Sequence, residues 1–272
     1  MGRTPLLLSR SKRLRQVALV IQTVNIVALK ALFERPAQGR AMFNRYYHMY
    51  AALKGAGVAW SVRSLFEAFP EARDVSVVVE HKPGAAIVAD VKELCYLAII
   101  TRVLAPKRVF EIGTYRGRTA LNFALNSPVG CEVLTLDLPP EDQATPVHKA
   151  DKRIAMSRVN QIGSEFRDPP AGSKIRQLWG DSMTFDFSPF AGTVDLVFID
   201  GAHHYEAVLS DTQNALELLS NSGLAAIIWH DFGNFGDYFD VTRAILDSGV
   251  GLSVFQLEDT QLAVYLRKDR GL

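Results

Sequence analysis

Titratable side chains follow two apolar runs in the second half of the chain. The run "VFI" is followed by Asp200 and, three residues later, by His203, while the run "AIIW" is followed directly by His230 and Asp231. Apolar runs of this kind are typical of buried parallel strands, which lie about 4.8 Å apart and end at the same edge of a sheet. Carboxylates and an imidazole brought together there suit a divalent cation. We therefore predict a magnesium or manganese site formed by Asp200, His230 and Asp231.

A second pattern, "VFEIGTYRGRTA", joins another apolar run to a helix through a glycine turn. Gly113 and Gly117 flank the turn, which contains Thr114, and Glu111 lies just before it. Glycines permit such tight turns, and the amides at the start of the following helix can face a ligand. The spacing G-x-x-x-G departs from the dinucleotide-binding pattern G-x-G-x-x-G, which disfavours a nicotinamide-dependent oxidoreductase.

Two further run ends offer polar groups suited to a nucleoside. Asp137 ends the run "EVLTL" and suits the two hydroxyls of a ribose, although such an acid can also be a turn or cap residue. Gly180, Asp181 and Ser182 follow the run "KIRQL" next to Trp179 and suit an adenine edge.

The elements that position these groups alternate in type from residue 75 onward. Short runs rich in β-branched and apolar residues, beginning with "VSVVV" at 75–79, alternate with helix-like stretches, which favours a parallel sheet covered on both faces. The last two runs, "LSVFQL" and "LAVYL", are joined by "EDT" and predict an antiparallel hairpin. We therefore expect an α/β fold with a mostly parallel, doubly wound sheet in residues 71–272.

Two segments fall outside this alternation. Residues 1–70 consist of helix-like pieces cut by glycine and proline, contain no clear strand, and are expected to form an N-terminal helical accessory segment. Residues 138–173 are irregular and follow a strand end, where such sheets build their sites. They predict either a lid or acceptor-binding insertion or an ordinary crossover helix.

The composition limits the partners and the compartment. The 30 basic and 29 acidic residues balance, so no nucleic-acid partner is indicated. Cys95 and Cys131 favour small core residues in a reducing compartment over a disulfide framework. The apolar run after "RSKRLR" is interrupted by Gln22, Asn25 and Lys30, which predicts a cytoplasmic protein rather than a signal peptide or an anchor. Membrane-surface contact is an alternative for this helix, and self-association into a homo-oligomer is another.

The order of these motifs resembles that of class I S-adenosylmethionine-dependent methyltransferases from about residue 75 to the end of the chain. The likeness lies in "EIGTYRG", in the acid of "LTLD", in "GDS" and in "VDLVFIDG". It implies S-adenosylmethionine as cofactor and a Rossmann-like seven-stranded sheet whose last strand is antiparallel. In that family the glycine turn touches the methionine part, the strand-end acid holds the ribose, and "GDS" lies by the adenine. The implied cofactor-binding residues are Glu111, Gly113, Thr114, Gly117, Asp137, Asp181, Ser182 and Asp200.

The stretches "VFIDGAHHYE" and "AIIWHDF" are similar to motifs of metal-dependent O-methyltransferases of the macrocin and catechol type, whose acids at these strand ends hold the metal. Macrocin-type relatives carry a general-base histidine three residues after the first acid, which is His203 here. His230 stands where those relatives commonly have an acid and shifts the donor set toward manganese, iron or zinc. The resemblance implies O-methylation of a small hydroxylated acceptor, such as a sugar in a natural product or surface glycan, with Asp200 and His203 as catalytic residues.

Simpler structural roles compete with these assignments. Asp200 and His203 could cap the helix that follows them, and His230 could form only a structural hydrogen bond. Asp211 could lie on a solvated helix face or support the site from behind. A hydroxylase-like relative or a non-catalytic member of the same scaffold would carry the same motifs.

Overall fold

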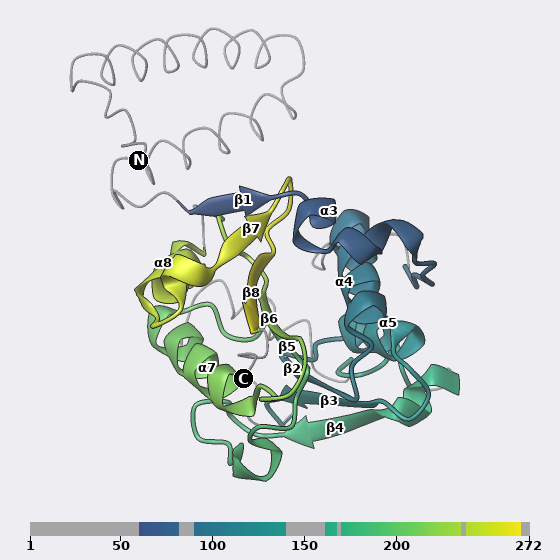
Figure 1. Ribbon diagram of the computed structural model, residues 1–272. Helices are drawn as coiled ribbons and strands as arrows, with labels where there is room; N and C mark the ends of the chain where they lie inside the picture. Colours follow the sequence, from purple (N-terminus) through teal and green to yellow (C-terminus); the bar gives the residue numbers. More distant parts are fainter. Residues whose placement is uncertain (1–59, 82–89, 140–160, 168–169, 235–237, 268–272) are drawn as a thin grey trace, which may run out of the picture. The chain divides into compact units, whose positions relative to one another are not determined.

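The computed structural model describes residues 60–81, 90–139, 161–167, 170–234 and 238–267 (Figure 1). Every element described below belongs to a compact unit that spans Ala59–Leu272. The helical segment expected over residues 1–70 lies mostly outside the described residues, and its extent stays a prediction. Within the described part of the chain, no helix is both long and apolar enough to cross a membrane.

Eight strands form one sheet in the order β1-β7-β8-β6-β5-β2-β3-β4. Neighbouring strands are parallel except that β8 runs antiparallel to both β6 and β7. This arrangement confirms the expected Rossmann-like, mostly parallel sheet with an antiparallel last strand, but the sheet has eight strands rather than seven, because β1 adds one at the edge. The strands are β1 (Ser61–Arg63), β2 (Arg108–Ile112), β3 (Glu132–Asp137), β4 (Ile175–Trp179), β5 (Leu196–Ile199), β6 (Ala225–Trp229), β7 (Phe255–Leu257) and β8 (Ala263–Arg267).

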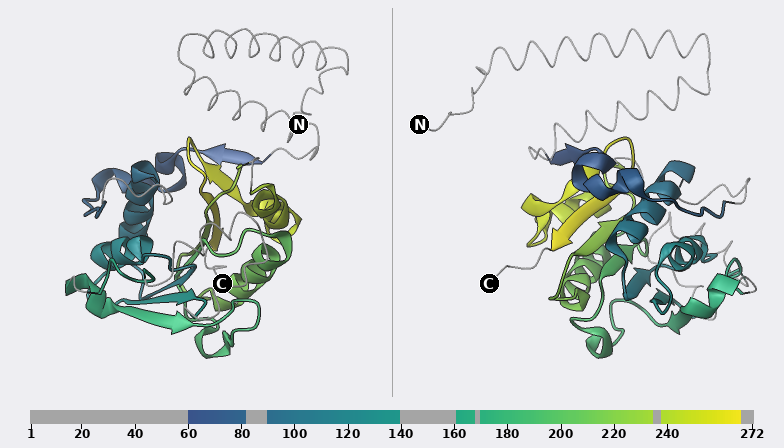
Figure 2. Two further views of the ribbon diagram at one scale, coloured as in Figure 1. Left: turned by 180° about the vertical axis from the view of Figure 1, so that it is seen from behind. Right: turned by 45° about the vertical axis from the view of Figure 1, so that its right-hand side comes forward.

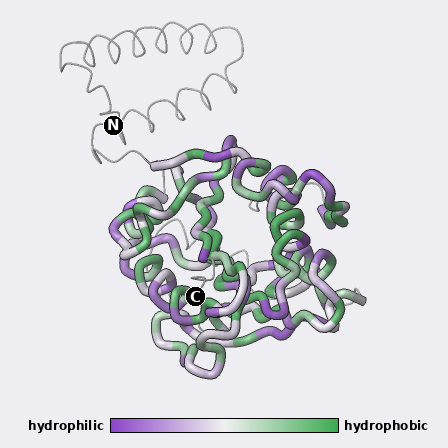
Figure 3. The backbone as a smooth tube through the Cα atoms, in the orientation of Figure 1, coloured by the Kyte–Doolittle hydropathy of each residue, from purple (hydrophilic) through white to green (hydrophobic). Residues whose placement is uncertain are grey.

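Helices cover both faces of the sheet (Figures 1 and 2). One face packs against α3 (Leu65–Ala68), α4 (Val91–Leu104) and α5 (Arg118–Asn126), and the other against α7 (Tyr205–Leu218) and α8 (Phe239–Asp247). Every residue of the central strands β5 and β6 is buried, and the tube drawn in Figure 3 is mainly hydrophobic there. Covering both faces explains why these strands are continuous apolar runs rather than alternating ones.

The strand β1 lies within the segment that was expected to be helical and without a clear strand. It pairs in parallel with β7 at one edge of the sheet. All three of its residues are exposed. A three-residue edge strand with no buried face has no apolar alternation, so the sequence pattern could not reveal it.

The run "VSVVV" at 75–79 was expected to be a strand, and this prediction is wrong. The segment is extended but pairs with no strand of the described sheet. Its backbone instead bonds to two asparagine side chains of α5. The amides of Val78 and Glu80 donate to Asn126 and Asn122 over 2.9 and 3.0 Å, and both side-chain amides donate back to the carbonyls of Val78 and Glu80. These side chains take the place of a neighbouring strand.

Candidate active site

The glycine turn between β2 and α5 lies against the backbone that follows β5. Gly113 has a φ of +100°, and a Cβ atom there would overlap the carbonyl oxygen of Asp200. The amide of Asp200 donates to the carbonyl of Ile112 over 2.9 Å. A larger residue at position 113 would therefore lack both room and an unstrained backbone. The predicted cofactor turn and the first predicted metal acid are thus in direct contact.

Asp137, at the end of β3, holds the same glycine turn from its other side. Its Oδ2 accepts hydrogen bonds from the amides of Thr114 and Tyr115 at 3.1 and 2.9 Å, and its Oδ1 accepts from the amide of Leu138 at 2.8 Å. An acid at this strand end therefore fixes the shape of the turn directly. The structure places the predicted cofactor residues Thr114 and Asp137 side by side.

Glu111, predicted to bind the cofactor, lies beneath the turn with only 1% of its surface exposed. The hydroxyl of Thr135 donates a short hydrogen bond to its carboxyl, and the same hydroxyl lies 2.7 Å from that of Thr114. Burial raises the pKa of Glu111 well above its ordinary value, and the charges of Asp200 and Asp137 add to the effect. Glu111 thus supports the turn from within the core.

The residues after β4 form the outer end of this row of turns. The amide of Gly180 donates to the carbonyl of Asp137 over 3.0 Å, which places the two strand ends together. Asp181 accepts from the amide of Met183 at 3.0 Å and so acts as a turn residue. The side chains of Trp179 and Met183 are both 46% exposed and offer an apolar surface beside it.

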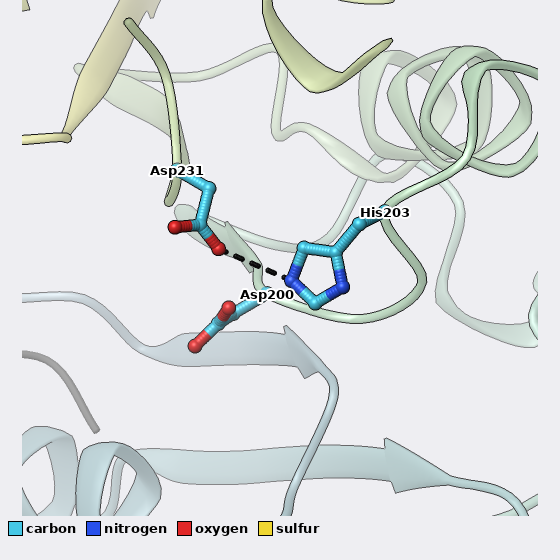
Figure 4. Close-up of side chains that lie close together, drawn as sticks. All are labelled: Asp200, His203 and Asp231. Carbon is cyan, nitrogen blue, oxygen red and sulfur yellow. Dashed lines mark ion pairs between the residues drawn. The ribbon is translucent and has the colours of Figure 1, made fainter. Parts of the chain in front are cut away.

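Asp200, His203 and Asp231 converge at the carboxyl edge of β5 and β6. Each offers a donor atom, and the three atoms lie within 4.8 Å of one another. Figure 4 shows the side chains pointing toward a common centre, with Nε2 of His203 3.1 Å from Oδ2 of Asp231. His203 and Asp231 are buried, whereas Asp200 is half-buried. The predicted metal and base residues therefore form one cluster.

The backbone at Asp231 departs from the extended strand. Its φ is +57°, in the left-handed region that few residues other than glycine, asparagine and aspartate adopt readily. The flanking amides fix this conformation, because His230 donates to the carbonyl of Ile199 and Phe232 donates to that of Gln261, each over 3.0 Å.

An aromatic ring holds the imidazole of His203. The ring of Tyr238, at the start of α8, stacks on it with a centroid distance of 4.2 Å and an interplanar angle of 29°. Stacking on one side and the Asp231 carboxylate at Nε2 together fix the plane and the direction of the imidazole. Sequence reasoning missed Tyr238, which lies seven residues after Asp231 but has no distinctive pattern around it.

His230 belongs to the same cluster and connects it to α4. Its Nδ1 lies 3.3 Å from Oδ2 of Asp231 and 3.6 Å from Oδ1 of Asp200, while its Nε2 lies 3.1 Å from Oε2 of Glu93. Sequence reasoning also missed Glu93. The pattern "DVKE" from Asp90 marks Glu93 as part of a capping box, which the structure confirms, but gives no sign that it reaches β6.

The charges of this cluster shift the pKa values of its members in opposite directions. Burial alone would lower the pKa of His230, but the carboxylates of Asp200, Asp231 and Glu93 outweigh it and raise that pKa well above its ordinary value. Burial alone would raise the pKa values of Asp231 and Glu93, yet their histidine partners lower both. The carboxylates are thus held in the ionised form.

Part of the segment expected as a lid, insertion or crossover helix is in contact with the glycine turn. Residues 161–167 form turns, and the amides of Gly163 and Glu165 donate to the carbonyls of Tyr115 and Arg116 over 2.8 and 2.9 Å. Glu165 also forms a buried two-pronged ion pair with Arg118 at 2.8 and 2.9 Å. Residues 140–160 lie outside the described residues, so the choice between these roles stays open for them.

The structure answers two of the competing structural interpretations. The N-cap residue of α7 is His204, and no side chain caps this helix, so neither Asp200 nor His203 acts as its cap. Asp211 is fully buried on α7, so the prediction of a solvated helix face is wrong. Its carboxyl oxygens accept no hydrogen bond of good geometry within the described part of the chain. Burial raises its pKa to about 7, although its contact with the side chain of Ser182 acts in the opposite direction.

Comparison with known proteins bears on the chemistry of this edge. Residues 110–232, which contain the glycine turn and both strand-end motifs, match the family model described as a methyltransferase domain. This chain carries a methyltransferase domain. The sheet of this methyltransferase, with its antiparallel β8, agrees with the expected class I S-adenosylmethionine-dependent fold, and the family match agrees with that class.

Solved structures resemble the methyltransferase only distantly, and no curated protein sequence matches it. A methyltransferase from Podospora anserina with bound SAH is 17% identical, with a TM-score of 0.47 over 82% of this chain and 95% of that chain. An O-methyltransferase from Bacillus cereus in complex with SAH is 13% identical, with a TM-score of 0.43 over 75% and 89%. The O-methyltransferase TomG from Streptomyces achromogenes, in complex with SAM, is 13% identical, with a TM-score of 0.42 over 81% and 96%.

Proposed function

We propose that this methyltransferase transfers the methyl group of S-adenosylmethionine to a hydroxyl oxygen of a small acceptor, such as a sugar in a natural product or glycan. The observation that carries the proposal is the convergence of Asp200, His203 and Asp231 beside the glycine turn. A methyl donor held by the turn would then lie next to an imidazole and two carboxylates.

The row of turns at the ends of β2, β3 and β4 fits the cofactor. Gly113 and Gly117 have left-handed backbones and no side chains, so the backbone at these two positions is open to a ligand. We assign this turn to the methionine part of S-adenosylmethionine. Asp137 is assigned to the ribose hydroxyls, and Asp181 and Ser182 lie beside the exposed rings and thioether of Trp179 and Met183, which suits the adenine. Glu111 contributes by holding the turn in place.

His203 is assigned the role of general base. An alcohol is almost wholly protonated at neutral pH, and an imidazole has an ordinary pKa of about 6.5. Oδ2 of the ionised Asp231 lies 3.1 Å from Nε2 of His203 and accepts from it, so this carboxylate stabilises the imidazolium that forms when the His203 ring takes the proton of the acceptor hydroxyl. A positioned base of this kind typically accelerates such a step by about 100- to 10,000-fold.

The same cluster fits a divalent metal ion by its donor chemistry. Carboxylate oxygens of Asp200 and Asp231 and an imidazole nitrogen of His230 or His203 are ligands that manganese, iron and zinc accept. An ion held there would stabilise negative charge on the acceptor oxygen.

The proposal is tested with His203→Ala in the full chain. We expect methyl transfer from labelled S-adenosylmethionine to catechol and sugar acceptors to fall by about 100- to 10,000-fold, with cofactor affinity measured by calorimetry unchanged. His204→Ala, which changes the neighbouring histidine, is the matched control and should keep most of the activity. Equal activity of the His203 variant and the wild type would contradict the proposed base.

A further inference from the structure

Glu93 brings a carboxylate from α4 to the end of β6. Its Oε2 lies 3.1 Å from Nε2 of His230, and its Oε1 accepts from the amide of Gln261 at 2.7 Å. The amide of Asp90 donates to the same Oε2 over 3.2 Å as part of the capping box. Contacts with three elements therefore fix this carboxylate, which is only 6% exposed.

The position of Glu93 decides which way the His230 ring faces. With Nε2 at Glu93, Nδ1 points to the space between Oδ1 of Asp200 and Oδ2 of Asp231, at 3.6 and 3.3 Å. Nδ1 is buried and makes no hydrogen bond of good geometry within the described residues. Two carboxylates beside one buried ring nitrogen call for a positive charge between them, which either a proton on Nδ1 or a metal ion that displaces this proton can supply.

A histidine that binds a metal through one ring nitrogen almost always has a carboxylate, carbonyl or water at the other. We propose that Glu93 is a positioning residue that turns His230 into an Nδ1 ligand for a first-row divalent transition metal held with Asp200 and Asp231. This inference rests on the metal site of the proposed function and adds the residue that orients it. It also separates the site from an all-oxygen set, which magnesium and calcium prefer.

The alternative is that the contact between Glu93 and His230 is only a structural ion pair, which ties α4 to the sheet. The two roles predict different effects of Glu93→Gln. As a purely structural pair, Glu93 would affect folding and leave the metal affinity of a folded variant unchanged. As a positioning residue, it sets the direction and basicity of His230, so its loss weakens metal binding.

The experiment uses metal-free full-length protein and needs neither cofactor nor acceptor. Mn²⁺ is titrated, its affinity is measured by calorimetry, and nitrogen coupling to bound Mn²⁺ is recorded by pulsed paramagnetic resonance. We expect Glu93→Gln to bind Mn²⁺ about 10- to 100-fold more weakly. Glu67→Gln is the matched control, because Glu67 occupies the same capping-box position in α3 but is exposed, and its affinity should equal that of the wild type.

Two further variants identify the ligating ring. The nitrogen coupling should vanish in His230→Ala and persist in His203→Ala. Thermal unfolding and cofactor binding show whether Glu93→Gln is folded, and Glu93→Asp supplies a second variant that keeps the charge but shortens its reach. Wild-type affinity in folded Glu93 variants, nitrogen coupling from His203 alone, or no Mn²⁺ binding to the wild type would each overturn the inference.

The failure of this inference is distinguishable from failure of the proposed function. Methyl transfer by protein that binds no metal would leave the O-methyltransferase proposal and its His203 base standing and remove the role of Glu93. Metal binding that depends on Glu93, without methyl transfer to any hydroxylated acceptor, would support the role of Glu93 and contradict the O-methyltransferase proposal.

Discussion

Nε2 of His203 lies 3.1 Å from Oδ2 of Asp231, so an imidazole from the loop after β5 is paired with a carboxylate from the end of β6. The contact joins residues that are 28 positions apart in the sequence. Register between the two strands makes this possible, because Ile199 and Trp229 are direct partners and the two strands end side by side.

Replacing Asp231 with asparagine should lower methyl transfer by roughly 100-fold or more while leaving cofactor affinity unchanged. The amide removes the charge that holds the protonated His203, but asparagine tolerates the left-handed backbone at this position. Initial rates and calorimetric cofactor titrations measure the two effects. Asp259→Asn is the control, because Asp259 also has a left-handed φ, of +56°, and its side chain is 79% exposed. Full activity of Asp231→Asn would contradict the pairing as a functional contact.

Replacing Gly113 with alanine should destabilise the fold and weaken cofactor binding together. The new Cβ atom would overlap the carbonyl oxygen of Asp200, which forces the turn and the β5 end apart. Gly130→Ala provides the comparison, because Gly130 has a similar φ of +86° but open space around it. We expect about 1–2 kcal/mol of destabilisation at position 130 from backbone strain and clearly more at position 113. Urea unfolding measures both, and equal losses at the two positions would argue against the close contact.

Glu165→Gln should lower the free energy of unfolding by about 3–5 kcal/mol, because it leaves the buried charge of Arg118 without its partner. The same variant should bind the cofactor more weakly, since residues 161–167 also hold the glycine turn. The exposed pair of Arg243 and Asp247 is a control of the same chemistry, and Asp247→Asn should cost less than about 1 kcal/mol. A loss at position 165 as small as this would show that the buried pair does not anchor the segment.

Asp211→Asn should change the pH dependence of stability. The pKa of Asp211 is about 7 in the folded chain and about 3.9 in the unfolded chain, so between these values the folded state keeps a proton that the unfolded state has lost. The contribution of Asp211 to the free energy of unfolding of the wild type therefore decreases as the pH rises from 4 to 7, by up to about 1.4 kcal/mol per pH unit, and is constant above pH 7. The asparagine variant lacks this loss, so its stability relative to the wild type should rise between pH 5 and 7. Urea unfolding at several pH values tests this, and a constant difference would show that the carboxyl is not held protonated.

The sequence was most informative where chemistry and strand ends coincide. Asp200, His203, His230 and Asp231 could be brought together in advance because parallel strands end at one edge, and each run had a clear apolar signature. Glu93 and Tyr238 could not be foreseen, because their contacts depend on how α4 and α8 pack and their local patterns had ordinary explanations.

Errors in the secondary structure have equally local causes. The run at 75–79 has strand composition, but Asn122 and Asn126 take up its backbone hydrogen bonds, and side-chain partners of this kind leave no periodic signal. The strand β1 is short and exposed on an edge, where neither burial nor alternation marks it. Asp211 looks like a surface acid in the sequence because its burial depends on the packing of α7 against the sheet.

Successive side chains of a regular strand project to opposite sides, so a sheet edge ordinarily gains one group from each strand at a given place. The left-handed torsion at Asp231 interrupts that alternation, and both His230 and Asp231 lie close to Asp200. The left-handed backbone at one residue thus lets two side chains beyond β6 reach this edge of the sheet. A substitution that returned residue 231 to an extended conformation would point the side chains of residues 230 and 231 to opposite sides of the sheet, and only one of the two would still lie near Asp200.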